Sequence, residues 1–174
     1  MQKRKSDEKG FTLIEVIVTL ILVGITAALA GMWIVSVANG YIFARMNAGT
    51  VQKGQLAITR LTKEFSALQS VTATASAPTS ITFNRADPGN PSGIPVTVSQ
   101  SGNTLQLNVN NAGNSILMDN VAGFTLRYCS TPGSTTCPDQ TWSSSSRIIE
   151  ITLTVAGADN VPSTFTIRAT PRNL

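Results

Sequence analysis

One long apolar run dominates the pattern of hydrophobic and polar positions. It covers residues 11–38, 28 residues in which Glu15 is the only ionisable side chain. As an α-helix this run would be about 42 Å long, whereas the hydrocarbon core of a bilayer is about 30 Å thick. The pattern therefore predicts a membrane-spanning helix. Basic residues precede the run and only Arg45 follows it closely, so we expect a cytoplasmic N-terminus and an extracytoplasmic remainder.

Beyond residue 38 the apolar positions keep a helical spacing. No proline occurs before Pro78, so the pattern predicts one helix over residues 11–70, with an amphipathic part at 39–70. Its apolar stripe is expected to pack on the domain that follows, rather than to form a coiled-coil seam. The stripe consists of Val51, Ile58, Leu61, Phe65 and Leu68, and the charged residues off it are Lys53, Arg60, Lys63 and Glu64.

From residue 71 to residue 174 the apolar positions alternate, and Ser, Thr, Asn and Gly become frequent. Strands are expected at 81–83, 96–98, 105–109, 116–118, 124–128, 149–155 and 165–168, with a loop at 86–95 and turns at 101–103 and 110–114. This region has no second helical pattern. The predicted fold class is α+β: a long N-terminal helix, whose first half spans a membrane, packed against an antiparallel β-sheet head.

The charge distribution speaks against a nucleic-acid partner. The net charge is +4, but from residue 71 onward five arginines balance five acidic residues and no lysine occurs.

The sequence has no histidine, which excludes Ser-His and Cys-His nucleophiles. We expect no cofactor and no metal, because the spacing of Asp87, Asp119 and Asp139 resembles no calcium-binding loop. No set of residues forms a recognisable catalytic constellation.

The sequence contains two cysteines, Cys129 and Cys137. Outside the cytoplasm such a pair usually forms a disulfide, and closing so short a loop contributes about 2.5 kcal/mol. Glu150 and Arg168 are interpreted as exposed strand residues that could pair across strands, and Trp142 as a core or loop anchor.

Three kinds of processing fit the N-terminal segment. Ala28-Leu29-Ala30 before Gly31 resembles a signal-peptidase site, although the apolar run continues past it. An uncleaved single-pass anchor fits the length. A cut between Gly10 and Phe11 would place Glu15 one helical turn from a new α-ammonium group. A carboxylate in a membrane costs about 2.5–3.5 kcal/mol, so Glu15 needs a partner: the amine of a neighbouring copy or its own helix dipole.

The segment from Lys9 to Val16, KGFTLIEV, resembles the class III signal of type IV pilins and of type II secretion pseudopilins. The resemblance implies cleavage after Gly10 by prepilin peptidase, N-methylation of Phe11 and pairing of Glu15 with the α-amine of an adjacent subunit. The implied partners are other pilins or pseudopilins and the inner-membrane assembly platform. Many major pilins carry a helix-breaking proline where Met32 lies here.

The residues 119–128, DNVAGFTLRY, and the end at Arg172-Asn173-Leu174 are similar to J-type pseudopilins and W-type minor pilins. This second resemblance implies a non-enzymatic structural subunit of a type IV pilus or a type II secretion pseudopilus, in a complex at the filament tip that primes assembly. The alternative is a membrane-anchored extracytoplasmic binding module, which would need neither Gly10-Phe11 nor Glu15. The expected organisation is a cleaved leader (1–10), a transmembrane part (11–38), an amphipathic part (39–70) and a β-rich head (71–174).

Overall fold

The computed structural model describes residues 10–131 and 133–173, and no side chain is described for residues 73–75. Helix α1, Leu13–Ser66, comes first, and eight strands follow it in the described residues. The protein divides into two units between Ala44 and Arg45. The N-terminal unit contributes the first part of α1, and the C-terminal unit contains the last part of α1 and all the strands.

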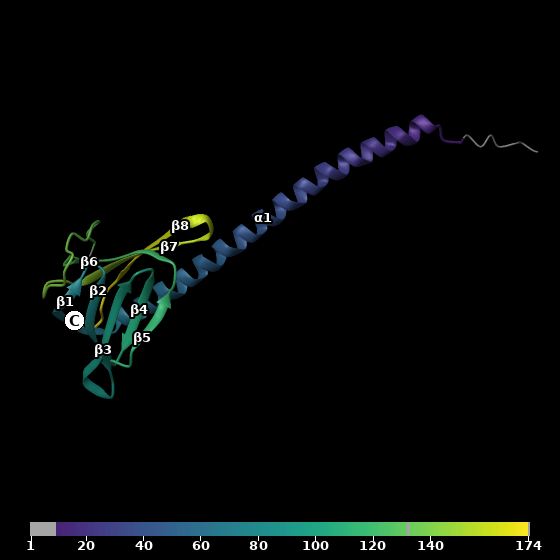
Figure 1. Ribbon diagram of the computed structural model, residues 1–174. Helices are drawn as coiled ribbons and strands as arrows, with labels where there is room; N and C mark the ends of the chain where they lie inside the picture. Colours follow the sequence, from purple (N-terminus) through teal and green to yellow (C-terminus); the bar gives the residue numbers. More distant parts are fainter. Residues whose placement is uncertain (1–9, 132, 174) are drawn as a thin grey trace, which may run out of the picture. The chain divides into compact units, whose positions relative to one another are not determined.

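The strands form two antiparallel sheets in the C-terminal unit. The five-stranded sheet has the order β1 (Leu68–Ala77), β2 (Ser80–Asp87), β3 (Asn90–Ser101), β4 (Thr104–Val109) and β5 (Asn114–Met118). The three-stranded sheet has the order β6 (Val121–Cys129), β7 (Ile148–Ala156) and β8 (Pro162–Ala169), with a short 3-10 helix at Ala158–Asn160 (Figure 1). The α+β fold class is confirmed, with two sheets instead of a single one.

The last turns of α1 are part of the hydrophobic core. Ala57, Leu61 and Phe65 are almost completely buried, and the Phe65 ring lies 5.3 Å from that of Phe83 on β2. Both sheets supply the other side of this core. Ile58, Leu61 and Phe65 of the expected apolar stripe therefore do pack against the head, whereas Val51 is half-buried and Leu68 belongs to β1. Burial of these helix residues favours the docking of α1 on the head.

The prediction that Glu64 lies off the packed face of the helix is wrong. Its side chain is buried and only 1% exposed. Its carboxylate accepts hydrogen bonds from Arg85 Nη1 on β2, at 3.2 Å to Oε1 and 2.9 Å to Oε2, and its Oε1 lies 2.7 Å from Arg60 Nη2. Two guanidinium groups compensate the buried charge, so the carboxylate can lie on the core side of the helix.

The start of the sheet also differs from the sequence prediction. Helix α1 ends at Ser66, not near residue 70, and β1 begins only two residues later.

The prediction of a loop at 86–95 is wrong, because β2 continues to Asp87 and β3 begins at Asn90. Pro91 and Pro95 are tolerated inside β3 because they lack only a donor. Their carbonyls still accept hydrogen bonds, from Gln69 Nε2 (3.1 Å) and from the Asn110 N–H (2.8 Å).

The two expected turns are confirmed. The β3–β4 hairpin closes at Gly102, which has a φ of 57°. The turn between β4 and β5 contains Asn110, Asn111 and Gly113, all with positive φ. Asparagine and glycine adopt this left-handed conformation at the lowest cost, which is why the sequence signal was reliable at these positions.

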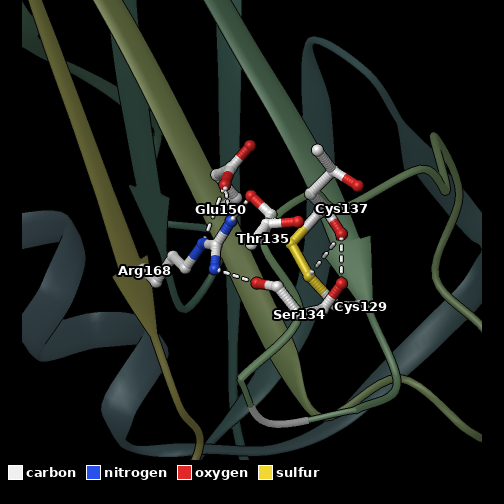
Figure 2. The surroundings of a disulfide bond; sticks show 7 residues. Cys129, Ser134, Thr135, Cys137, Glu150 and Arg168 are labelled. Atoms are coloured by element: carbon white, nitrogen blue, oxygen red, sulfur yellow. Dashed lines mark hydrogen bonds and ion pairs between the residues drawn. A yellow bond between two sulfur atoms is a disulfide. The ribbon is translucent and has the colours of Figure 1, made fainter.

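The disulfide between Cys129 and Cys137 is present, with the two Cα atoms 4.7 Å apart. Figure 2 shows that Arg168 reaches the same loop: its guanidinium donates to the backbone carbonyl oxygens of Ser134 and Thr135. The Arg168 Nε donates to Glu150 Oε2 at 2.8 Å, across the register pair that joins β7 and β8. The cross-strand pair considered in the sequence is therefore formed, and it also holds the disulfide loop.

Removal of the disulfide is expected to destabilise the head. Replacing both cysteines by serine should lower the free energy of unfolding by about 2.5 kcal/mol, because the unfolded protein regains the entropy of the opened loop. For a unit of this size the melting temperature should fall by roughly 9 °C. Thermal unfolding followed by circular dichroism measures the change. Reduction of the wild-type protein should reproduce it, whereas reductant should leave the serine variant unchanged. Equal melting temperatures for wild type and variant would contradict the prediction.

Candidate processing and assembly site

The Gly10–Phe11 peptide bond lies in non-helical backbone just ahead of α1. A Cβ atom added to Gly10 would meet nothing within 4 Å, and the Phe11 side chain is 81% exposed. Peptidases act on accessible backbone that is free of regular structure. The bond at which the sequence predicts cleavage therefore lies where a peptidase can reach it.

Glu15 lies in the first turn of α1. Its backbone N–H lies 3.1 Å from the Thr12 carbonyl oxygen and 3.4 Å from Thr12 Oγ1. The spacing Thr12-x-x-Glu15 is that of a capping box, so Thr12 is a residue that the sequence prediction missed although its signal is visible there. The carboxylate thus occupies the positive end of the helix dipole, which favours a negative charge.

Glu15 takes part in no ion pair within the described residues. The two nearby threonines, in contrast, satisfy their hydroxyl groups within the helix. Thr19 Oγ1 donates to the Val16 carbonyl oxygen at 2.9 Å, and Thr26 Oγ1 bonds to the Leu22 and Val23 carbonyl oxygens at 3.0 Å. In a membrane, Glu15 would therefore be the group of this segment that most needs a partner from another molecule.

The first part of α1 exposes nearly all its large apolar side chains. By length and composition α1 can cross a membrane, and its most apolar window has no buried residue. At Gly24, Gly31 and Gly40 an added Cβ would meet nothing within 4 Å. Gly24 with Ala28, and Ala27 with Gly31, form small-xxx-small pairs that permit close approach of a second helix.

A comparison with protein families finds one motif at this segment. The model of the prokaryotic N-terminal methylation motif matches residues 5–31. These residues form a class III signal of the type IV pilin and pseudopilin kind. The pilin-type signal implies processing by prepilin peptidase, assembly with other pilins and single-pass anchoring in the inner membrane. No curated protein and no solved structure matches the sequence.

The structure does not gather the acidic residues of the head into one site. Within residues 10–131 and 133–173, no group of three or more Asp, Glu, Cys or His side chains is arranged to hold a metal ion. Asp87 ends β2, and Asp119 lies 3.2 Å from Lys53 Nζ. The backbone of Asp139 forms a bridge with Tyr128. These three residues thus have separate structural surroundings.

Trp142 and Tyr128 form part of the core of the head. Their rings meet edge to face, with centroids 5.6 Å apart, and both side chains are buried. Burial raises the pKa of the Tyr128 hydroxyl far above its usual value, so this group stays protonated at any physiological pH. The interpretation of Trp142 as a core anchor agrees with this packing.

Proposed function

We propose that this protein is a minor pilin or a pseudopilin, a non-enzymatic structural subunit of a type IV pilus or of a type II secretion pseudopilus. The observation that supports the proposal most strongly is the combination at one helix end. Inside the pilin-type signal, an accessible Gly10–Phe11 bond and the Glu15 carboxylate, which has no ionic partner among the described residues, lie within six residues of each other.

In the proposed mechanism, prepilin peptidase cuts after Gly10 and removes residues 1–10. The new α-amine of Phe11 becomes methylated and keeps its positive charge. Glu15 of one subunit and the Phe11 amine of its neighbour then pair inside the membrane, where an unpaired charge is very unfavourable. Apolar contact alone would allow helices to slide past one another, whereas this pair sets their register.

The proposed topology follows from the charges around the helix. The basic leader stays in the cytoplasm, residues 11–38 span the inner membrane, and residues 39–70 and 71–174 are extracytoplasmic. The formation of a disulfide in the head suits an oxidising compartment. After assembly the subunit resides in the pilus or in the periplasmic pseudopilus.

A place in the tip or priming complex is the finer part of the proposal. Its support is the resemblance of residues 119–128 to J-type pseudopilins and W-type minor pilins. This segment includes most of β6, a strand of the three-stranded sheet. Glu15 is present, which argues against the pseudopilin type at the extreme tip, since that type lacks this residue.

The N-terminus of the mature protein tests the proposal. Intact mass and N-terminal sequencing of protein from native membranes should find a mature form that begins with N-methylated Phe11. Gly10→Val should stay unprocessed, because a branched side chain would hinder the approach of the peptidase to the scissile bond. Gly31→Val is the matched control and should be processed normally. A wild-type protein that begins at Met1 would indicate an anchored module, and one that begins at Gly31 a secreted protein. Either result would overturn the proposal.

A deletion strain separates the two machines. Loss of secreted enzymes would identify a secretion pseudopilus, whereas loss of twitching or of DNA uptake would identify a pilus.

A further inference from the structure

A groove of the C-terminal unit lies between the last turns of α1 and strand β8, and has a volume of about 780 Å³. Ile58 from the helix and Ile167 from the strand supply apolar lining. Lys63 and Arg172 lie at the same groove and are both exposed. The backbone N–H of Arg172 donates to the Ser66 carbonyl oxygen at 3.1 Å, which ties the C-terminal segment to the end of the helix.

The groove is basic, and two of its cations have no ion-pair partner among the described residues. Its third cation, Arg168, is engaged by Glu150 and by two loop carbonyl oxygens. Among the described residues, no carboxylate lies within ion-pair distance of Lys63 or Arg172. No acidic residue of the described part of the protein lines the groove. An occupant that combines a carboxylate with an apolar side chain would therefore complement it.

The turn between β7 and β8 presents such a combination. Asp159 is exposed, and the Val161 side chain is 45% exposed. Beyond Met46, the described residues include only two other exposed large apolar side chains, Leu56 and Ile116. Asp159 has a φ of 53°, in the left-handed region that aspartate and asparagine adopt more readily than most other residues do.

Three hydrogen bonds hold the turn in place. The Ala158 N–H donates to Asn47 Oδ1 on α1 at 2.8 Å. The Gly157 N–H donates to the Val161 carbonyl oxygen at 2.8 Å, and the Val161 N–H donates to the Ala158 carbonyl oxygen at 3.2 Å. A turn that is ordered before it binds loses little conformational entropy on binding.

The other acidic residues of the head suit the groove less well. Glu64, Asp119 and Glu150 already form ion pairs. Asp87 and Asp139 are not adjacent in sequence to any of the exposed large apolar side chains. Among the acidic residues of the described head, Asp159 therefore offers the best match in both charge and apolar character.

The turn cannot reach the groove of its own molecule. Ile167 on β8 follows Val161 by six positions, which at about 3.3 Å per residue corresponds to roughly 20 Å. The packing of α1 along β8 agrees with this spacing: Asn47 contacts the turn, Gly54 lies against the Phe165 ring, and Ile58 meets Ile167 at the groove. The occupant must therefore come from another molecule.

We propose that the 157–161 turn of one copy of this protein docks into the groove of a second copy. Asp159 then lies between Lys63 and Arg172, and Val161 contacts Ile58 and Ile167. Because the turn and the groove are different surfaces, the contact is heterologous and can continue from copy to copy without closing. The inference rests on the coarser part of the proposed function, a pilin-like subunit that is present in more than one copy in a filament, and not on a place in the tip or priming complex.

Charge reversal in two variants tests this contact. The turn variant carries Asp159→Lys, and the groove variant carries both Lys63→Glu and Arg172→Glu. Each full-length protein also carries a photoreactive phenylalanine at Thr59, an exposed helix residue that lines the groove. Mass spectrometry of irradiated membranes then measures the yield of cross-links from position 59 to the 157–161 peptide of a differently tagged copy. Association through the membrane helices alone does not place position 59 beside the 157–161 turn of another copy, so the cross-link reports the contact between heads.

The turn variant alone and the groove variant alone should each lose about tenfold in cross-link yield, since like charges then meet in every contact. Co-expression of the two variants should restore the yield, because the altered turn then meets the altered groove with opposite charge. The unaltered turn of the groove variant likewise meets the unaltered groove of the turn variant. Asp87→Lys and Asp139→Lys are matched controls and should leave the yield unchanged. Restoration on co-expression also shows that both variants are folded.

Three results would each overturn the contact: wild-type yield from the turn variant alone, no restoration on co-expression, or no cross-link in the wild type. The N-terminus of the same samples keeps the two proposals separate. Processing after Gly10 without a charge effect would refute the contact alone. A charge effect without that processing would refute the proposed function and leave the contact between copies standing.

Discussion

Glu15→Ala is expected to leave the protein inserted and processed but depleted at least tenfold from filaments or from the priming complex. In the proposed pairing, loss of the carboxylate would leave the Phe11 amine of the neighbouring subunit without a partner in the membrane, and an unpaired buried charge costs several kcal/mol. Glu15→Lys should be worse, because it adds repulsion between two cations. Immunoblots of the membrane fraction and of sheared filaments or the isolated priming complex measure the distribution of each variant.

Thr19→Ala provides the control for this experiment, since the Thr19 hydroxyl is already satisfied by its own helix. It should assemble like the wild type. The helix-dipole role of Glu15 predicts a smaller effect, because such interactions contribute about 0.3–1 kcal/mol, or at most roughly fivefold. Normal incorporation of both Glu15→Ala and Glu15→Lys would refute the pairing mechanism.

The second large effect is expected in the head, at Glu64. Glu64→Gln should lower the free energy of unfolding by about 3–5 kcal/mol, because it removes the negative charge that compensates Arg85 and Arg60. The Arg85 side chain is only 25% exposed, so water cannot fully replace the lost partner. A fall of roughly 10 °C or more in the melting temperature should follow for a unit of this size. Thermal unfolding monitored by circular dichroism measures it.

Two further variants identify the cause of that loss. Arg60→Met should cost only about 1 kcal/mol, since the Arg60 side chain is 42% exposed and Arg85 still pairs with the carboxylate. Replacing Glu64 and Arg85 together by methionine should lower the free energy of unfolding less than Glu64→Gln does, because the Arg85 charge is then removed together with its partner. If the double variant were the less stable one, the explanation by an uncompensated charge would be wrong.

Local features of the protein were predictable because they depend on neighbours in sequence. An uninterrupted apolar run, a helical stripe and alternating strand positions need no knowledge of distant residues. The turn residues at Gly102 and Asn110–Gly113 were informative for the same reason. The loop predicted at 86–95 failed because proline was interpreted as a breaker, whereas two prolines lie inside β3 and still accept hydrogen bonds.

The sequence by itself determined the pilin-type signal, the position of Glu15 in an apolar helix and the α+β order of the elements. Only the tertiary structure decided which polar side chains meet. Glu64 is buried because Arg85 approaches from a strand, 21 residues further along the sequence. Arg168 holds the disulfide loop, and the basic groove forms where β8 and the C-terminal segment meet α1. Such contacts join residues that are far apart in sequence. The local pattern of apolar and polar positions does not determine which strand packs beside which turn of the helix.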